Sequence, residues 1–355
     1  MTRLPVAVVG CGHLGGIHAR LLAARDDAEL VAVVDPDPVA RERVAAAHRC
    51  AALDAPERIV GRARAAVIAA PTGLHTAVSL PLLEAGLDLL VEKPLAADVE
   101  ESRAIVTTAR RLGRIVAVGH VERFNPAWNL VTERIGRVLS VEMRRLAPFT
   151  FRSLDVGVVH DLLIHDIDLV LSLSPGRLIA VDAQGLSATG GHEDAVRVRL
   201  AFGSGMVADL VASRIHPTAE RRATLWTSGG VYHVDMNART ADCVEPSAAV
   251  RDGAYVASAV PSADRNAARE TFFTTVLPRT TLTAAADANP LADEQTDFLA
   301  AVRERRPPRV SAADGAAAVE IAQRVLDALR PVRFGGDHPA TLPLPEPIWP
   351  RRRTG

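Results

Sequence analysis

The chain has 355 residues, which is enough for about two domains with a sizeable apolar core. It is 48% hydrophobic and 23% charged, as ordinary globular proteins are, and its formal net charge of −1 gives no electrostatic reason to expect nucleic acid or a membrane surface as a partner. Three scattered cysteines without a CxxC pair indicate neither a disulfide framework nor a zinc site. This cysteine pattern fits a reducing compartment, so we expect a cytoplasmic protein, and no segment approaches the length of a transmembrane helix.

The first element is a short apolar strand that runs into a glycine-rich turn. Residues 9–15 read Val-Gly-Cys-Gly-His-Leu-Gly, the G-x-G-x-x-G pattern of dinucleotide-binding domains, and a helical pattern follows at once. Such glycines permit a sharp turn, the approach of a pyrophosphate and close packing of helix on strand, while the open N–H groups of the helix suit phosphate. We predict a cofactor-binding loop formed by Gly10, Gly12, His13, Leu14 and Gly15.

A second apolar strand ends in Asp35, twenty residues after Gly15. An acid at this place binds the adenosine ribose and repels a 2′-phosphate, and no Arg or Lys stands between Asp35 and Arg41. The pattern therefore predicts NAD rather than NADP as cofactor. The alternative is a glycine turn and a surface acid in an unrelated α/β domain, which leaves the register of strand, turn, helix, strand and acid unexplained.

Strand and helix patterns alternate through the first 120 residues. Strands are predicted at 65–70, 87–91 and 114–119, and helices at 39–48, 75–86 and 98–112. Pro81 is expected to kink or break the second of these helices. Near-continuous apolar strands between helices indicate a parallel sheet, whose ligands bind beyond the carboxyl ends of the strands. The candidate strand ends are residues 71–72, 92–94 and 120–126.

The pattern changes after Trp128 to an alternation of apolar and polar residues, which is typical of half-exposed strands. These strands are predicted at 139–144, 195–200 and 206–211, with a further hairpin over 223–234, and late helices at 291–304 and 314–329. We therefore expect an α/β protein with a Rossmann domain over 1–122 and an α+β domain over 123–330 that has an open, mainly antiparallel sheet. The final helices are free to pack back on the first domain, and residues 331–355 form a Pro-rich tail.

Polar residues recur on an otherwise apolar helix in the second half. They are Asp161, His165, Asp168 and Ser172. Steps of four, three and four place them in one stripe, which on a buried helix should face a cleft, a partner or other polar groups. The alternative is a structural set of hydrogen bonds in a core. His160 and His165 point to different faces and no HExxH is present, so no metal site is expected.

Lys93 follows a predicted buried strand at the carboxyl edge of the first sheet, where the nicotinamide end of the cofactor should lie. A lysine there can hold a substrate hydroxyl and stabilise charge on oxygen. As a lone surface lysine it would carry no meaning, but the glycine loop on the same sheet edge makes it a candidate.

Taken in order, the glycine loop, Asp35, Glu92-Lys93-Pro94 and Asp161-x-x-x-His165 resemble the Gfo/Idh/MocA family of NAD(P)-dependent sugar and inositol oxidoreductases. The likeness covers almost the whole chain, including the stretches 71–75 and 291–315. It implies that the catalytic residues are Lys93, Asp161 and His165. It also implies further cofactor contacts from Pro71, Thr72, His75, Glu92 and Lys93.

The resemblance further implies the chemistry of these residues. His165 takes the hydroxyl proton, since the unperturbed pKa of histidine, about 6.5, suits transfer near neutrality. Asp161 orients the imidazole or binds a sugar hydroxyl, and Lys93 holds the reacting oxygen. The order of proton movements between Lys93 and His165 stays open.

Residues 119–126 and 148–157 resemble more narrowly the branch that oxidises UDP-N-acetylglucosamine at C3 for a partner aminotransferase. Arg123, Asn125 and Arg152 are then expected to bind the nucleotide sugar, and their alternative role is in interdomain salt bridges and turns. The double or triple glycine often found before the family's helix aspartate is reduced here to Gly157. The other functions left open are a dehydrogenase of a free sugar or inositol and a non-catalytic NAD-binding regulator. A homodimer or homotetramer formed through the open sheet is expected.

Overall fold

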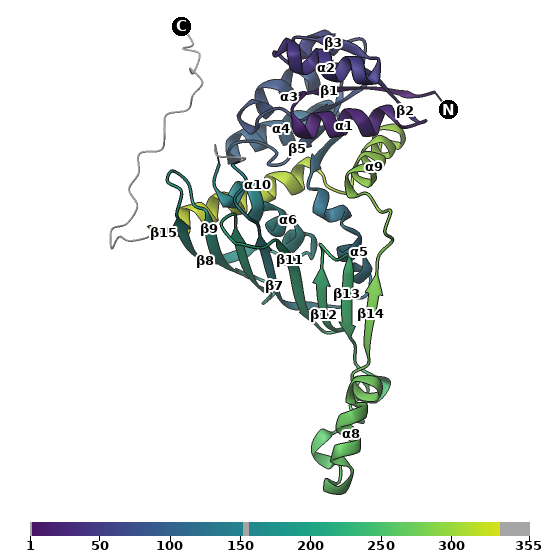
Figure 1. The fold of residues 1–355 in the computed structure, drawn as a ribbon, viewed down its shortest axis with the longest axis vertical. Coiled ribbons are helices and arrows are strands. Elements are labelled where there is room, and N and C mark those ends of the chain that lie inside the picture. The colour runs from purple at the N-terminus through teal and green to yellow at the C-terminus, as the bar shows by residue number, and fades with distance from the viewer. Residues whose placement is uncertain (1, 152–155, 334–355) are drawn as a thin grey trace.

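A computed structural model describes residues 2–151 and 156–333, and Figure 1 shows their arrangement around two sheets. Arg152, a predicted substrate contact, and nearly all of the predicted Pro-rich tail lie outside the described residues. Within them, none of the helices is both long and apolar enough to cross a membrane.

The first sheet is parallel and has the strand order β3-β2-β1-β4-β5-β6. Its strands are β1 (Leu4–Val9), β2 (Ala28–Val34), β3 (Ala51–Leu53), β4 (Ala65–Ile68), β5 (Asp88–Glu92) and β6 (Val116–Gly119). Its helices are α1 (His13–Ala23), α2 (Pro38–His48), α3 (His75–Glu84) and α4 (Val99–Leu112). This is the predicted Rossmann fold, and its strands are buried almost throughout because helices lie on both faces.

Local sequence explains where these helices begin. Asp37 caps α2 by accepting a hydrogen bond from the Val39 N–H, and Asp98 caps α4 by accepting one from the Glu101 N–H. The helix predicted over 98–112 is confirmed, and Asp98 is its N-cap. Of the kink or break expected at Pro81, the break does not occur, because α3 runs through this residue and ends at Glu84.

The second sheet has nine strands in the order β14-β13-β12-β11-β7-β10-β9-β8-β15. They are β7 (Val138–Leu146), β8 (Leu178–Ser187), β9 (Ala195–Phe202), β10 (Val207–Ser213), β11 (Glu220–Thr227), β12 (Gly230–Asp235), β13 (Thr240–Val244), β14 (Arg279–Thr283) and β15 (Leu329–Arg333). The predicted hairpin over 223–234 forms, and the strands predicted at 195–200 and 206–211 pair with each other. All pairs are antiparallel except β7 with β10 and β8 with β15. The sheet is therefore mixed, and mainly antiparallel as expected.

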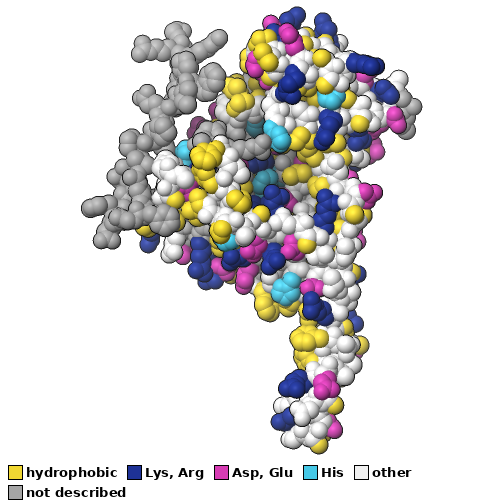
Figure 2. Space-filling model, viewed as in Figure 1, with side chains coloured by type: hydrophobic (Ala, Val, Ile, Leu, Met, Phe, Trp, Pro, Cys, Tyr) yellow, Lys and Arg dark blue, Asp and Glu magenta, His cyan; other side chains and the backbone are white. Residues whose placement is uncertain are grey.

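The two faces of this sheet differ in chemistry. Strand residues such as Val141, Leu200 and Leu225 are fully buried on the face that carries α5 (Pro126–Thr132), α6 (Ile164–Ser172) and α10 (Ala312–Ala328). The other face bears ion pairs, among them Arg199 with Asp209. Figure 2 shows acidic and basic side chains gathered on this outer face. Period-two patterning predicted this division.

The last helices return to the first domain. Helix α9 (Pro290–Glu304) places Phe298, Leu299 and Val302 in the apolar cluster that contains β1 and α1 side chains. At its end Arg303 pairs with Asp27 at 2.9 Å. Helix α10 packs against α4 and α6 and so joins the two halves of the chain.

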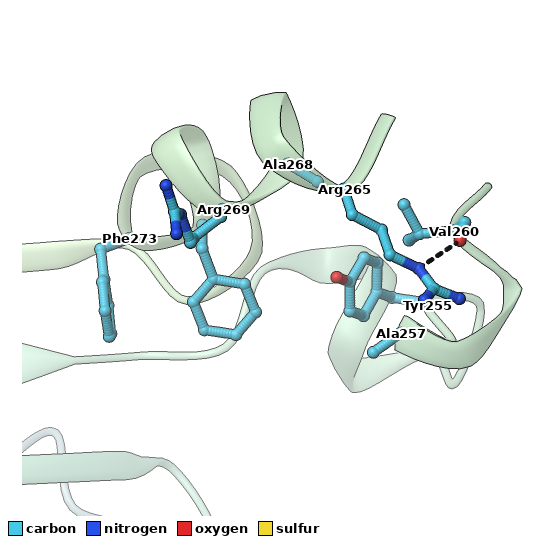
Figure 3. A pocket seen from close by; sticks show the side chains of 8 residues that line it. Tyr255, Ala257, Val260, Arg265, Ala268, Arg269 and Phe273 are labelled. Carbon is cyan, nitrogen blue, oxygen red and sulfur yellow. Dashed lines mark hydrogen bonds between the residues drawn. The ribbon is translucent and has the colours of Figure 1, made fainter. Parts of the chain in front are cut away.

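Residues 245–278 form an arm that extends from the sheet between β13 and β14 (Figure 1). It carries α7 (Ala248–Arg251) and α8 (Arg265–Thr271), and none of its residues is buried. A pocket of about 300 Å³ lies within it, lined by Tyr255, Phe272 and Phe273 among others (Figure 3). The arm has no counterpart among the sequence predictions.

The close approach of Gly15 to the Gly10 carbonyl oxygen can be tested by measuring stability. A Cβ on Gly15 would lie 1.8 Å from the Gly10 carbonyl oxygen, whereas a Cβ on Gly16 meets nothing within 4 Å. Gly15→Ala should lower the free energy of unfolding by roughly 1–3 kcal/mol, as overpacking does. The control Gly16→Ala should leave stability equal or raise it by up to about 1 kcal/mol, because alanine favours the helix. Urea unfolding measures both, and equal stabilities would contradict this account of the turn.

Candidate active site

The glycine loop has the geometry of a phosphate cradle. Gly10 adopts a φ of +99°, and a Cβ there would lie 2.5 Å from the Ala69 carbonyl oxygen, so the turn requires glycine. A Cβ on Gly12 would meet nothing within 4 Å, which leaves the backbone open to a ligand. Gly12 is also the N-cap of α1, and His13 and Leu14 begin that helix. The residues therefore fit the pyrophosphate of a dinucleotide at the positive end of the helix dipole.

Asp35 lies beside this loop at the end of β2. One carboxylate oxygen accepts the Cys11 N–H at 2.7 Å, and the other accepts the Asp37 N–H at 2.9 Å. Each oxygen keeps a further lone pair for a ribose hydroxyl. The guanidinium of Arg41 donates to the backbone oxygens of Asp35 and Pro36 and stands close to this position.

The turn after β4 is tied to the turn after β5. His75 is buried, and its ring nitrogens lie 2.9 Å from the carbonyl oxygens of Pro94 and Ala70. Both nitrogens are therefore engaged by backbone, and His75 shapes the two turns. Pro71 and Thr72 precede it at the sheet edge, where Pro71 is exposed and Thr72 half-buried.

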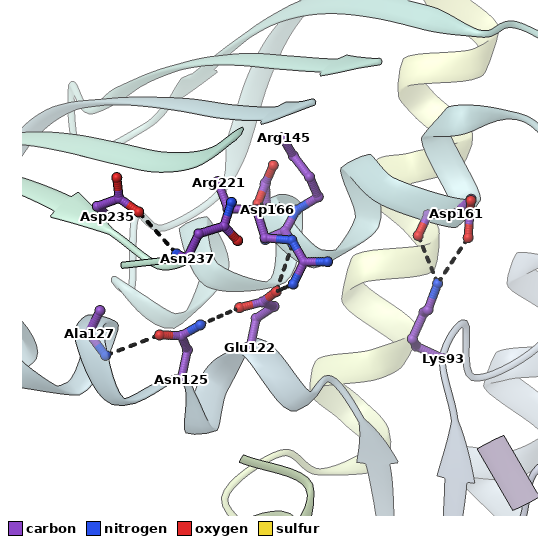
Figure 4. A network of polar contacts seen from close by, with 10 residues as sticks. All are labelled: Lys93, Glu122, Asn125, Ala127, Arg145, Asp161, Asp166, Arg221, Asp235 and Asn237. Atoms are coloured by element: carbon purple, nitrogen blue, oxygen red, sulfur yellow. Dashed lines mark hydrogen bonds and ion pairs between the residues drawn. The ribbon is translucent and has the colours of Figure 1, made fainter. Parts of the chain in front are cut away.

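Lys93 projects from the end of β5 to the second domain (Figure 4). Its Nζ donates to the Asp161 carbonyl oxygen at 2.7 Å and pairs with the Asp161 carboxylate at 3.5 Å. Burial lowers the pKa of Lys93 from its ordinary value, although the charges of Asp161 and Glu92 act in the opposite direction. Lys93 is thus held at the carboxyl edge of the first sheet by the segment that leads into α6.

Glu92 precedes Lys93 and turns inward. One carboxylate oxygen lies 2.8 Å from His18 Nε2, and the other accepts the Lys93 N–H at 3.2 Å. Burial raises the pKa of Glu92, but the hydrogen bond from His18 and the charge of Lys93 outweigh it, so the pKa lies below its usual value. Glu92, predicted as a cofactor contact, is engaged here by protein groups on both oxygens.

A π-helical turn, Val159–Leu163, leads into α6 and displaces the predicted polar stripe. The Val159 N–H at its start donates to the Glu193 carboxylate at 3.0 Å. That carboxylate occupies the space that a Cβ on Gly157 would fill, 1.9 Å away, so a glycine is required there. Because a π turn contains more residues than an α turn, the spacing of four from Asp161 does not continue the α6 face.

The stripe divides into two environments. Asp161 binds Lys93, whereas Asp168 is fully buried and receives a bidentate ion pair from Arg123 at 2.7 and 2.9 Å. Ser172 donates to the carbonyl oxygen of Leu169 within its own helix. The four polar residues therefore contact different groups, and the alternative of structural hydrogen bonds holds for Asp168 and Ser172.

His165 is half-buried and faces His120, which follows β6, with ring centroids 6.3 Å apart. Burial, followed by the charge of Lys93, holds the pKa of His165 well below its ordinary value. The imidazole is therefore neutral at neutral pH, and its buried Nδ1 has no hydrogen-bond partner among the described residues. Lys93, Asp161 and His165 thus lie in one region, with a neutral imidazole available as a proton acceptor.

His120 was missed as a site residue, although it lies within the predicted strand end 120–126. It is fully buried, and neither ring nitrogen has a hydrogen-bond partner in the part of the chain that the structure describes. Burial lowers the pKa of His120 despite the opposite effect of Asp168. Its position directly after a parallel strand was the available signal.

The predicted substrate contacts Arg123 and Asn125 are occupied by other protein groups. Arg123 pairs with Asp168, while Asn125 accepts the Ala127 N–H at 3.0 Å and donates to Glu122 at 2.9 Å. These are the salt-bridge and turn roles given as the alternative. Figure 4 shows Asn125 and Glu122 in a network with Arg145, whose guanidinium also binds Asp166 at 2.7 Å.

Two protein-family models match the chain, one in each domain. Residues 4–120 match the family described as "Oxidoreductase family, NAD-binding Rossmann fold", and residues 130–233 match the "GFO/IDH/MocA C-terminal domain". The chain is 34% identical to the UDP-N-acetylglucosamine 3-dehydrogenase of Acidithiobacillus ferrooxidans over 66% of this chain and 75% of that one. It is 31% identical to an inositol 2-dehydrogenase of Rhizobium meliloti over 58% and 68% of the two chains.

A solved structure of the Acidithiobacillus ferrooxidans UDP-N-acetylglucosamine 3-dehydrogenase superposes with a TM-score of 0.80 at 30% identity. The superposition covers 93% of this chain and 98% of that one, so the likeness extends through both domains. The chain therefore belongs to the Gfo/Idh/MocA family of oxidoreductases, with an NAD-binding Rossmann domain and the family's second domain.

Proposed function

We propose that the protein oxidises the C3 hydroxyl of UDP-N-acetylglucosamine, or of a related UDP-amino sugar, to a ketone with NAD. The carrying observation is the contact of Lys93 with Asp161 at the carboxyl edge of an NAD-binding sheet, together with the effect of the Lys93 charge on the neutral imidazole of His165. A regulator that only binds NAD needs the glycine loop but not this constellation. The placement of all three residues therefore supports an enzyme.

The chemistry assigned to these residues is a balanced two-electron oxidation. The substrate loses a hydride from carbon and a proton from its hydroxyl, and bound NAD supplies the hydride acceptor. His165 accepts the hydroxyl proton, because its imidazole is neutral. Lys93 donates a hydrogen bond to the reacting oxygen and stabilises the charge that develops there. Asp161 holds the Lys93 ammonium in position.

The choice of a nucleotide sugar is supported by likeness. The relative named as a UDP-N-acetylglucosamine 3-dehydrogenase is similar in sequence, and its structure matches both domains. A free inositol is the second candidate, because several curated relatives at 28–34% identity are inositol dehydrogenases. In the nucleotide-sugar case the 3-keto product supplies a partner aminotransferase, and a homodimer or homotetramer formed through the outer face of the second sheet is part of the proposal.

A sugar panel tests the substrate. NADH absorbance should rise with UDP-N-acetylglucosamine, and more strongly when hydroxylamine traps the ketone, because oxidation of a secondary alcohol by NAD is unfavourable at neutral pH. UDP, N-acetylglucosamine, glucose and myo-inositol serve as comparisons. Preferential turnover of myo-inositol or glucose would favour the second candidate, and no turnover of any sugar would favour the regulator.

Asp35 should set the cofactor preference. NAD should bind much better than NADP, and Asp35→Ser should narrow the ratio of the two dissociation constants roughly tenfold, about 1.4 kcal/mol, by removing the charge that repels a 2′-phosphate. The matched control is Asp37→Ser, because Asp37 caps α2 through Val39. Fluorescence titration with both cofactors measures the ratio, and equal affinity of the unaltered protein for NADP would refute this role of Asp35.

Lys93 and His165 should act as one catalytic unit. Lys93→Met and His165→Ala should each lower kcat by about 100-fold or more, with nearly unchanged NAD affinity, since the glycine loop and Asp35 bind the cofactor. The double variant should lose much less than the product of the single losses. His233→Ala, at an exposed position of β12, is the control. Melting temperatures separate the alternatives: an active His165→Ala protein ends the proposal, and a destabilised one indicates a structural role.

A further inference from the structure

A buried polar cluster lies behind Lys93, where α9 meets α1 and the end of β5. Its members are His18, Glu92, Glu294 and Gln295, whose exposed fractions are 0%, 7%, 2% and 0%. A ring nitrogen of His18 and one carboxylate oxygen each from Glu92 and Glu294 lie within 4.8 Å of one another. The chemistry assigned above to Lys93, Asp161 and His165 makes no use of Glu294 or Gln295.

Gln295 fixes the hydrogen bonding of the His18 ring. Its Nε2 lies 3.3 Å from the His18 carbonyl oxygen, which only accepts, so this atom is the amide nitrogen and not the oxygen. The same nitrogen lies 2.9 Å from His18 Nδ1, which must therefore be an acceptor. The ring proton is then on Nε2 and is donated to Glu92 at 2.8 Å. Both ring nitrogens of His18 are therefore engaged, Nε2 by Glu92 and Nδ1 by Gln295.

The two carboxylates of the cluster, Glu92 and Glu294, differ in their hydrogen-bond partners. Glu92 accepts from His18 Nε2 and from the Lys93 N–H, and the Lys93 charge stands nearby. Both carboxylate oxygens of Glu294 are buried and have no hydrogen-bond partner among the described residues. Two carboxylates at this separation with one ammonium group near them do not both ionise at low cost. Glu294, the carboxylate without a partner among the described residues, therefore retains its proton.

The groups around Glu294 reinforce this assignment. The titratable groups near Glu294 come from four elements. They are Glu92 of β5, Asp168 of α6, Asp297 of α9 itself and His18 of α1. Arg123 already pairs with Asp168, and the ring nitrogens of His18 are engaged by Glu92 and Gln295, so no group of this set pairs with Glu294. Burial, followed by the charge of Glu92, raises the pKa of Glu294 well above its ordinary value.

Histidine and two glutamates are also metal ligands, which is the competing interpretation of the cluster. A metal needs a free lone pair on the imidazole. Here Nε2 carries the proton given to Glu92 and Nδ1 accepts from Gln295, so neither nitrogen offers one. The observations favour a proton over a divalent cation.

We infer that Glu294 is a protonated carboxylic acid that presents its O–H to Glu92 and thereby positions the Glu92–Lys93 turn. Glu294 is then a positioning residue that acts through Glu92, whose carboxylate holds the backbone of Lys93. The protonation stands on the cluster alone, whereas its effect on turnover rests on the proposed function.

The pH dependence of stability tests the proton without any substrate. Below pH 4.5, the ordinary value for glutamate, folded and unfolded chains both hold the proton. Above it, the unfolded chain releases a proton that the folded protein keeps, so the stability contributed by Glu294 falls as pH rises toward its raised pKa. Glu294→Gln keeps the shape but cannot ionise. Its melting temperature should exceed that of the unaltered protein by a margin that grows by roughly 3 °C or more between about pH 5 and about pH 8.

Glu29→Gln, at an exposed position of β2, is the control for the loss of one charge. The difference between its melting temperature and that of the unaltered protein should stay the same as the pH rises. A metal-bound or ionised Glu294 predicts the reverse, a Glu294→Gln protein less stable at every pH, and that outcome overturns the inference. Added Zn²⁺ should leave the melting temperature of the unaltered protein unchanged, and a rise that Glu294→Gln abolishes would assign the cluster to a metal. Should Glu294→Gln fail to fold, infrared spectroscopy of the unaltered protein decides, because a carboxylic acid band at about pH 8 is required.

Positioning is tested separately by turnover. Glu294→Leu should lower kcat with little change in NAD affinity, and Glu294→Gln should recover most of that loss because its amide still donates to Glu92. Equal kcat in Glu294→Leu and the unaltered protein would remove the positioning role but leave the stability result intact. If no sugar is oxidised, the proposed function fails, while the melting curves still report on the proton.

Discussion

The contact of Lys93 with Asp161 is the constraint on which the candidate site depends, because it joins the carboxyl edge of the first sheet to the segment before α6. Each partner is held by its own surroundings. Glu92 fixes the backbone of Lys93 from behind, and Glu193 fixes the start of the π turn that carries Asp161. The lysine therefore reaches the second domain from a rigid strand end rather than from a mobile loop.

Buried ion pairs join the segments that follow the first sheet to helix α6 and the second sheet. Arg123 pairs with Asp168, and Arg145 pairs with both Glu122 and Asp166. Removing one partner from such a pair leaves an uncompensated charge, which costs more than the intact pair contributes. These arginines come from segments just after the first sheet and from β7, so they fix α6 relative to both sheets. By holding α6 they position His165, and with it the segment that carries Asp161.

The sequence was sufficient to predict those features that depend on residues close together in the chain. The G-x-G-x-x-G turn, the acid after β2 and the cap at Asp98 each depend on neighbours within one or two elements. The polar stripe failed at its later members, because Asp168 binds Arg123 and Ser172 binds a carbonyl oxygen of its own helix, and periodicity alone shows neither contact. The roles of Arg123 and Gln295 could not be assigned because their partners lie 45 and 277 positions away in the chain.

The return of α9 has a consequence for how the molecule is made. Phe298, Leu299 and Val302 complete the apolar cluster of the first domain, and Gln295 holds a histidine of α1. During synthesis the ribosome releases the first sheet and its helices long before it reaches α9. Part of the apolar surface of the nascent Rossmann domain therefore stays exposed until nearly the whole second domain has emerged from the ribosome. Contacts of such long sequence separation slow folding, since the chain between them must be ordered first. The cofactor domain is thus first in the chain and among the last parts to be finished.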